Sequence, residues 1–313
     1  MVTYNRLETL KIALGHILSQ TIQPSSIVIV DNNSTDGTQD YLHTIDGQSN
    51  IHCIFMNSNT GSAGAIARAM EFGLLHGTYH YFWVLDDDTF YASNALHDLL
   101  ENIQQTDFAM LGLNGARVRW GKKFYVDPNI KLQEADYAMI DGALVKTEVV
   151  QQLGPLCADF FMMCDDHEYS VRLRRNGFKI GVLKNGADKR LVLGGTGQFT
   201  KSTLWRGYYS ARNHMFIIKK HFSFTDLVGY VYHQLKLLAI AAIFAPDRFS
   251  RVKFRLMGIW HGVLGVGGRT LDPATLKFVP RKSGFPSTSN ILIHLPLLAS
   301  NLYEYLDTGI DIL

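Results

Sequence analysis

The stretch Tyr81-Phe82-Trp83-Val84-Leu85-Asp86-Asp87-Asp88 joins an apolar run directly to three acids. A short apolar run bounded by polar residues is typical of a buried strand. We therefore predict a strand that ends at Leu85 and delivers the aspartates to one edge of a sheet. Crowded carboxylates repel one another unless solvent or a cation stabilises them, and their hard oxygen atoms suit magnesium or manganese. The alternative interpretation is a polar loop that caps the next helix.

Short apolar runs alternate with helical patterns on both sides of this stretch. Such alternation is typical of strand and helix units that build a sheet between two layers of helices. We therefore predict an α/β, Rossmann-like fold with a mixed, mostly parallel sheet. The expected strands are Val2 to Tyr4, Ile27 to Asp31, Ile51 to Met56, Tyr81 to Leu85 and, after a break in the pattern over Gly112 to Glu134, Ala138 to Val145. The expected helices are Leu7 to Gln20, Asp36 to His43, Ser62 to His76 and Ser93 to Gln105.

The composition sets limits on the class of protein. A chain of 313 residues that is 47% hydrophobic can bury a large core, and 30 basic against 28 acidic residues give no reason to expect a nucleic-acid partner. Cys53, Cys157 and Cys164 lack the short paired spacings of zinc sites and disulfide frameworks, which favours a reducing, cytoplasmic location. The apolar start at Met1 to Tyr4 does not predict a secretory signal.

Two further polar loops follow predicted strands, where open α/β sheets bind ligands. In the loop Asp31-Asn32-Asn33-Ser34-Thr35-Asp36-Gly37, the first carboxylate can accept a hydrogen bond from a ribose or a base, or it can cap the next helix. In the loop Asn57 to Gly64, the glycines Gly61 and Gly64 open a helix, and the amides of a helix N-terminus attract phosphate or carboxylate groups.

A second group of acids, Asp165-Asp166-His167-Glu168, opens a helical pattern that ends at Gly177. Asp165 as the N-cap and Glu168 three residues later predict a capping pair. Asp166 remains, and we interpret it as a general base for an attacking hydroxyl group. The alternative is a structural acid that favours the helix dipole.

Taken together, these motifs resemble family 2 glycosyltransferases with the GT-A fold over about the first two-thirds of the chain. The N-terminal motifs are Val2-Thr3-Tyr4-Asn5-Arg6, Val30 to Asp36, Asn57-x-Asn59-x-Gly61-x-Ala63-Gly64 and Asp86-Asp87-Asp88. Further on, Asp141-Gly142-Ala143 resembles the acceptor-side strand of the family, Asp165-Asp166-x-Glu168 its catalytic acid pair, and Trp205-x-x-Tyr208-Tyr209-x-x-Arg212-Asn213 a motif of bacterial polysaccharide members.

The resemblance implies an inverting enzyme that uses Mn²⁺ or Mg²⁺, a nucleotide diphosphate sugar, and a glycan or polyprenyl-diphosphate-linked acceptor. It implies Asp166 as the catalytic base and Asp86 and Asp88 as metal ligands. Donor-binding positions are Thr3, Asn5, Asp31, Asn59, Gly61, Asp86 and Asp87, and acceptor-binding positions are Asp141, Gly142, Asp165 and Trp205.

The triple aspartate and the Tyr-Tyr-x-x-Arg-Asn stretch are most similar to galactofuranosyltransferases and rhamnosyltransferases of cell-wall, O-antigen and capsule assembly. UDP-galactofuranose is the favoured donor, and dTDP-rhamnose is the alternative. A nucleotide-sugar binding module without catalysis and a nucleotidyltransferase are the competing functions.

One departure from the family concerns the metal. Related enzymes often place a metal-binding histidine shortly after the acid helix, but the matching stretch, Arg190 to Gly197, has none. His167 and His214 are near in sequence, and water can also complete a metal shell. The third protein ligand therefore stays open.

The composition changes at His221, which predicts a catalytic domain over residues 1–220 and a helical region over residues 221–313. Leu227 to Ala245 has the length of a membrane span, but His233, Gln234 and Lys236 lie in its middle, where polar groups are costly. Two interpretations stay open: an amphipathic helix on the inner face of the cell membrane, or a subdomain that packs on the core or on a second copy of the chain. The basic residues that would favour the membrane are Lys219, Lys220, Arg248, Arg251, Lys253 and Arg255.

Overall fold

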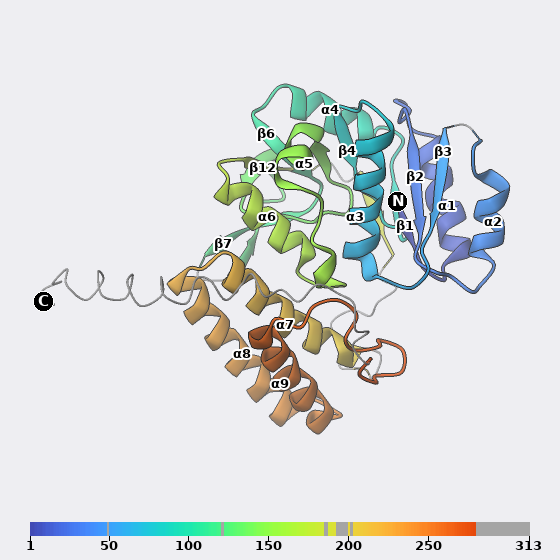
Figure 1. Ribbon diagram of the computed structural model, residues 1–313. Coiled ribbons are helices and arrows are strands. Elements are labelled where there is room, and N and C mark those ends of the chain that lie inside the picture. Colours follow the sequence, from blue (N-terminus) through green and yellow to red (C-terminus); the bar gives the residue numbers. More distant parts are fainter. Residues whose placement is uncertain (49, 120–121, 185–186, 192–199, 201–202, 280–313) are drawn as a thin grey trace, which may run out of the picture. The chain divides into compact units, whose positions relative to one another are not determined.

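The computed structural model describes residues 1–48, 50–119, 122–184, 187–191, 200 and 203–279. Residues Met1–Phe278 form one compact unit. Within it, an α/β part carries the sheets, and the helices that follow Thr203 lie together beside it (Figure 1).

The first three strands form a parallel sheet in the order β1-β2-β3. Both faces of this sheet are covered, because neighbouring side chains of a strand point to opposite faces: Ile29 packs in the core cluster of Leu10 and Leu14, and Val30 in that of Ile66 and Met70. The elements are β1 (Val2–Thr3), α1 (Leu7–Leu18), β2 (Ile27–Asp31), α2 (Thr38–Ile45), β3 (Ile51–Phe55) and α3 (Gly61–His76). The predicted elements of this half are confirmed, with shifts of one to two residues at half of their ends.

A second sheet has the order β4-β11-β6-β12-β9, in which β6 and β12 are parallel and the other neighbours antiparallel. Its strands are β4 (Tyr81–Trp83), β6 (Phe108–Gly112), β9 (Leu132–Ala135), β11 (Leu144–Lys146) and β12 (Lys179–Leu183). A single parallel bridge between Val2 and Asp86 joins the two sheets. This bridge places the end of β1 directly beside the triple aspartate.

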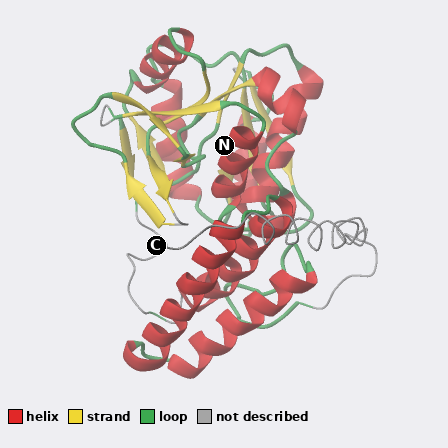
Figure 2. Ribbon diagram, turned by 90° about the vertical axis from the view of Figure 1, so that its left-hand side faces the viewer, coloured by secondary structure: helices red, strands yellow, loops and turns green. Residues whose placement is uncertain are grey.

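Smaller elements complete the α/β part. They are β5 (Thr89–Tyr91), α4 (Ala95–Gln104), β7 (Gly115–Arg119), β8 (Lys122–Tyr125), β10 (Tyr137–Ala138), α5 (Thr147–Leu153), η1 (Ala158–Phe160), α6 (Asp165–Arg175) and β13 (Asp188–Arg190). Helices and strands are coloured separately in Figure 2.

The predicted strand from Ala138 to Val145 is wrong in its middle. β10 ends at Ala138 and β11 begins at Leu144, and the residues between them form a turn. Gly142 has φ +81°, a left-handed conformation that favours glycine, and its amide donates to the carbonyl of Val84 at 2.8 Å. Asp141 therefore lies in a turn at the end of the sheet.

The last described helices, α7 (Leu204–Lys220), α8 (Phe224–Phe244) and α9 (Arg248–Leu264), pack against one another. Glycine permits the close approach of α7 and α9, because a Cβ atom on Gly258 would lie 2.3 Å from the carbonyl oxygen of Tyr208. α8 is long and apolar enough to cross a membrane by length and composition. The predicted domain boundary at residue 220 stays a prediction, and residues 280–313 lie outside the described part.

Candidate active site

Asp87 is the buried anchor of the triple aspartate. Its carboxylate accepts hydrogen bonds from the hydroxyl of Thr3 at 2.7 Å and from the guanidinium of Arg6 at 2.9 Å. Burial raises the pKa of Asp87, although Arg6 and Thr3 act in the opposite direction. Asp87 thus fastens the end of β1 to the loop after β4. Thr3 and Asp87, both predicted to bind the donor, contact each other.

The carboxylates of Asp86 and Asp88 lie close to that of Asp141. One oxygen of each carboxylate lies within 4.8 Å of the others, an arrangement that can hold a metal ion. Asp141 is held in place by the hydroxyls of Thr89 and Tyr91, both at 2.6 Å. We call Asp86, Asp88 and Asp141 the carboxylate seat.

The seat is electrostatically strained. Burial and the neighbouring carboxylates of Asp141 and Asp88 raise the pKa of Asp86 well above its ordinary value, while Arg190 lowers it. Such a shift is expected where like charges share a site from which water is partly removed. A cation bound between the three carboxylates would relieve the repulsion.

Two arginines contact the seat, and neither was predicted from the sequence. Arg190, the last residue of β13, lies 2.8 Å from Asp141 and 3.1 Å from Asp86. Arg6 pairs with Asp88 at 2.8 Å. Arg6 ends the motif Val2-Thr3-Tyr4-Asn5-Arg6, and Arg190 begins the stretch in which a histidine was expected. Both residues thus lie in motifs found in the sequence, but the sequence did not predict their ion pairs with the aspartates.

The chemistry of the seat fits a divalent cation. Oδ1 of Asp88 is buried and has no hydrogen-bond partner among the described residues. Carboxylate oxygens in a cluster are the ligands that Mg²⁺ and Mn²⁺ prefer. Asp141, predicted as an acceptor-side residue, supplies the third carboxylate. The part of the histidine-free stretch from residue 192 to residue 197 lies outside the described residues.

The loops predicted to bind the donor are held by hydrogen bonds within the protein. The buried Asp31 carboxylate accepts from the amide of Ser34 at 3.0 Å and from Gln39 at 2.7 Å. Asn5, at φ +51°, accepts from the amide of Thr35 at 2.7 Å. These bonds fix the two loops that lie at the ends of β1 and β2.

Asn59 and Gly61 build the start of α3. The side chain of Asn59 accepts from the amide of Gly61 at 2.8 Å. Gly61 has φ +76°, and a Cβ atom there would lie 2.0 Å from the carbonyl oxygen of Phe161. Glycine is therefore required for the contact between this loop and the segment that precedes α6.

The predicted capping pair of α6 is wrong. The N-cap is Cys164, at φ +63°, and the side chain of Glu168 is instead buried among basic residues of two helices. Arg172 lies 3.0 Å, Lys220 2.8 Å and His221 3.3 Å from its carboxylate. Burial opposes ionisation, but the hydrogen bond from His221 and the two cations outweigh it and lower the pKa of Glu168 to about 2.

Asp165 and Asp166 stand together in the first turn of α6. The Asp166 carboxylate accepts hydrogen bonds from the phenol of Tyr137 and from the amide of His167. Burial and the neighbouring Asp166 raise the pKa of Asp165 to about 7. Of the two acids, Asp165 is buried and Asp166 is partly exposed, so Asp166 is the one that can meet a substrate.

The segment before these acids has an unusual backbone. Phe161, Met163 and Cys164 have φ values of +61°, +72° and +63°, which is uncommon for residues with side chains. Strained conformations persist where their surroundings enforce them, and they often occur at active sites. The amide of Asn213 supplies such enforcement, because it donates to the carbonyls of Phe160, Met162 and Met163 at 2.7 to 2.8 Å.

Arg212 and its aromatic neighbours complete this support. The fully buried guanidinium of Arg212 donates to the carbonyl of Phe160 at 2.9 Å and lies 4.6 Å from the centre of the Tyr209 ring. Trp205 packs edge-on against Tyr209. The Tyr-Tyr-x-x-Arg-Asn stretch therefore holds the segment that presents Asp165 and Asp166, a role that the sequence did not indicate.

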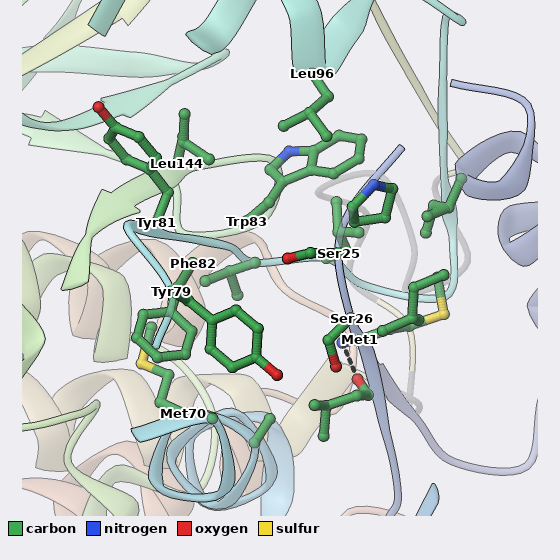
Figure 3. Close-up of a pocket in the computed structure, with 18 of the residues that line it drawn as sticks. Met1, Ser25, Ser26, Met70, Tyr79, Tyr81, Phe82, Trp83, Leu96 and Leu144 are labelled. Carbon is green, nitrogen blue, oxygen red and sulfur yellow. Dashed lines mark hydrogen bonds between the residues drawn. The ribbon is translucent and has the colours of Figure 1, made fainter. Parts of the chain in front are cut away.

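A cavity of about 320 Å³ lies away from these groups. Figure 3 shows it between β2, β4 and α3, with Met1, Met70 and Trp83 among its lining residues. It reaches the N-terminal end of β2 at Ile27 and Val28 and runs along β4 as far as Leu85. None of the predicted site residues lines it.

Comparison with protein families gives a match over residues 1–165, to the model described as glycosyl transferase family 2. Poly-beta-1,6-N-acetyl-D-glucosamine synthase of Staphylococcus aureus is 23% identical over 150 residues, which are 48% of this chain and 34% of that protein. Undecaprenyl-phosphate mannosyltransferase of Micrococcus luteus is 31% identical over 121 residues, 38% of this chain and 48% of that protein. The chain thus spans a third to a half of the length of these relatives.

Solved structures give the fold. TarS residues 1–349 from S. aureus matches with a TM-score of 0.57 at 14% identity, covering 84% of this chain and 79% of that one. A mannosyltransferase from Pyrobaculum calidifontis, solved with GDP-Man and Mn²⁺, matches with a TM-score of 0.53 at 14% identity and 84% coverage of both chains. TarS in complex with UDP-GlcNAc matches at 0.50, with 13% identity and coverage of 84% and 90%. The predicted GT-A fold is confirmed.

Proposed function

Because this chain belongs to glycosyltransferase family 2, we propose that it transfers a sugar, with inversion, from a nucleotide diphosphate donor to a glycan or polyprenyl-diphosphate-linked acceptor. The observation that carries the proposal is the carboxylate seat, where Asp86, Asp88 and Asp141 converge at the sheet edge beside the end of β1. Two proteins with this fold support the donor class, because one was solved with UDP-GlcNAc and the other with GDP-Man and Mn²⁺.

The seat would hold the cation through Asp86 and Asp88, with Asp141 as the third carboxylate. A bound Mn²⁺ or Mg²⁺ supplies charge that stabilises the leaving diphosphate. Asp87 is held by hydrogen bonds from Thr3 and Arg6 and so fixes the backbone of its neighbours Asp86 and Asp88. The nucleotide would bind beside loops that internal hydrogen bonds hold in place, those with Asn5 and Asp31 and the one with Asn59 and Gly61.

Asp166 is the proposed general base. The acceptor hydroxyl loses its proton to the Asp166 carboxylate while its oxygen bonds to the anomeric carbon, and the bond from that carbon to the diphosphate oxygen breaks. Attack from the face opposite the leaving group inverts the anomeric centre. Tyr137 donates a hydrogen bond to the Asp166 carboxylate and so orients it. We place Asp165, Gly142 and Trp205 on the acceptor side of the site.

For the donor we favour UDP-galactofuranose, with dTDP-rhamnose as the alternative. This preference rests on the triple aspartate and on the stretch from Trp205 to Asn213. Arg212 and Asn213 of this stretch support the segment before the two acids through hydrogen bonds to the carbonyls of Phe160 and Met163.

We also propose that α8 and α9 attach the protein peripherally to the cytoplasmic face of the membrane. Among the described residues, these two helices expose large apolar side chains, such as Tyr232 (69% exposed), Phe244 (75%) and Trp260 (57%), and the basic residues Arg248 and Lys253 are exposed on α9. Apolar side chains beside lysine and arginine favour the surface of anionic bilayers. A second copy of the chain is the alternative occupant of this face.

Vesicle sedimentation tests the attachment. The protein should sediment with anionic vesicles more than with neutral ones, and Trp260→Asp should weaken this. The control is Leu75→Asp, which changes an exposed leucine on α3 (75% exposed). Equal loss in both variants, or a stable dimer that masks the face, would argue against membrane contact.

A thermal-shift panel tests the enzyme class. A ligand that binds only the folded state raises the melting temperature, so we expect a shift with a nucleotide diphosphate sugar that grows when Mn²⁺ is added. Release of the nucleoside diphosphate with an acceptor present then separates an enzyme from a binding module. Pyrophosphate release from a nucleoside triphosphate and a sugar phosphate would instead identify a nucleotidyltransferase, and no shift with any uridine or thymidine nucleotide would reject the donor class.

A further inference from the structure

A basic side chain occupies the middle of the carboxylate seat. The guanidinium of Arg190 lies 2.8 Å from Oδ2 of Asp141 and 3.1 Å from Oδ2 of Asp86, both through Nη2, and its Nε lies 3.9 Å from Oδ1 of Asp88. Arg190 therefore approaches all three carboxylates that can hold a metal ion. No other basic residue among those described is paired with more than one of the three.

A metal ion and this guanidinium exclude each other. Nη2 of Arg190 lies 3.1 Å from Oδ2 of Asp86 and 2.8 Å from Oδ2 of Asp141. An ion that binds these two oxygens at about 2.0 to 2.1 Å, the distances of Mg²⁺, takes the place of the guanidinium. The ion would also stand beside a fixed positive charge. Either cation relieves the repulsion between the carboxylates, so the seat has two mutually exclusive counter-cations.

The anchoring of Arg190 allows the exchange. Its backbone is fixed, because β13 pairs with β5 and the next amide, that of Leu191, donates to the carbonyl of Asp88 at 2.8 Å. Its side chain is 34% exposed and is held by ion pairs. The long arginine side chain can therefore leave the seat without movement of the strand.

We propose that Arg190 is a tethered counter-cation that fills the carboxylate seat until a divalent metal ion displaces it, and that the displaced guanidinium then pairs with the diphosphate of the donor. This rests on the seat assigned in the proposed function. The exchange makes metal and nucleotide diphosphate bind cooperatively, because the diphosphate provides the anion that the displaced Arg190 needs. Metal alone must break the arginine pairs without such compensation.

The test is Mn²⁺ binding, measured by the loss of the free-ion electron paramagnetic resonance signal, with and without UDP. Arg190→Gln should bind Mn²⁺ alone about tenfold more tightly than the wild type, and UDP should strengthen its Mn²⁺ binding less than it does in the wild type. Lys189→Gln, which removes a neighbouring exposed charge, is the matched control and should behave as the wild type.

A second measurement covers the case in which Arg190→Gln folds poorly, because it leaves three carboxylates without this partner. Its melting temperature should fall in EDTA and recover in Mn²⁺, a recovery larger than that of the wild type. Unchanged or weaker Mn²⁺ binding by Arg190→Gln, or a loss of stability that Mn²⁺ does not restore, overturns the role of Arg190. Absence of Mn²⁺ binding by the wild type, with and without UDP, overturns the seat itself and thus the metal-dependent part of the proposed function.

Discussion

The two acidic clusters of this protein, the carboxylate seat and the pair Asp165 and Asp166, stabilise their carboxylates in different ways. In the carboxylate seat, guanidinium groups balance the charge of three acids: Arg190 pairs with Asp86 and Asp141, and Arg6 pairs with Asp88. At the start of α6, the phenol of Tyr137 donates a hydrogen bond to Asp166, and burial together with the neighbouring Asp166 raises the pKa of Asp165 to about 7. A cluster balanced by cations is suited to exchange one cation for another. A desolvated acid pair is suited to accept a proton.

The supports of the clusters differ as well. Asp86, Asp88 and Asp141 lie at strand ends and turns of the sheets, with Thr89 and Tyr91 of β5 holding Asp141. Asp165 and Asp166 follow a strained segment that α7 holds through Asn213. α7 thus supports the segment that precedes Asp166, so we expect changes in α7 to affect Asp166 and not the seat.

The largest expected effect is the loss of turnover when Asp166, in the acid pair at the start of α6, is replaced. Asp166→Asn removes the proposed base while keeping its shape, so turnover should fall by about a thousandfold, within the range for loss of a general base. Donor binding in the presence of Mn²⁺ should stay as in the wild type. Asp40→Asn, at an exposed position on α2, is the control. Unchanged turnover of the Asp166 variant would remove the base from this position.

Asn213→Ala tests the support of that cluster. It leaves the carbonyls of Phe160, Met162 and Met163 without the amide donor, and buried groups that lose a partner cost about 1 to 3 kcal/mol each. Denaturant unfolding should show a loss of about 3 kcal/mol, with reduced turnover and unchanged Mn²⁺ binding. Asn176→Ala is the matched control, because its exposed amide donates to one carbonyl, that of Arg172. Equal losses in the two variants would contradict a special role for Asn213.

Glu168→Gln tests how α6 is joined to α7. The pKa of Glu168 is lowered to about 2 from an ordinary value of 4.5, so its ionised form stabilises the fold above pH 4.5, and this contribution disappears as the pH falls to about 2. The variant should lose about 3 kcal/mol at pH 7 and converge with the wild type at low pH. Glu8→Gln, at an exposed pair with Lys11, should cost almost nothing. A loss that does not depend on pH would contradict the ionic cause.

Asp165→Asn should show the opposite sign. The pKa of Asp165 is raised to about 7 from 3.8, so the wild type loses stability as the pH rises from about 4 to 7, and the variant avoids this loss. At pH 8 it should gain on the order of 2 kcal/mol, since each pKa unit is worth about 1.4 kcal/mol and part is lost with the favourable charge at the helix N-terminus. Thermal unfolding at pH 4 and pH 8 measures the difference. A variant that is less stable at both would refute the burial of an unfavourable charge.

The sequence predicted what depends on local patterns. The loops after β2 and β3 and the helix from Asp165 to Arg175 follow from periodicity and from the residues at their ends. The strand before Asp86 was also predicted, but β4 ends at Trp83 and not at Leu85. The failed strand over Ala138 to Val145 is also local in appearance, but its apolar residues are buried by a turn at Gly142.

Contacts between distant segments were beyond the sequence patterns. Arg190 meets Asp86 across 104 positions of the chain, and Asn213 reaches Phe160 across 53. The capping pattern at Asp165 predicted a local partner for Glu168, but Lys220 at the end of α7 and His221 directly after it are its partners instead. Side-chain partners of this kind are set by packing, which a single sequence does not display.

The division of labour between the two clusters is tested most directly by measuring Mn²⁺-dependent nucleotide binding and turnover in the same two variants, Asp88→Asn and Asp166→Asn. We predict that Asp88→Asn loses most Mn²⁺-dependent binding of the nucleotide, whereas Asp166→Asn binds as the wild type does and loses turnover. Loss of binding in Asp166→Asn with normal binding in Asp88→Asn would contradict this division.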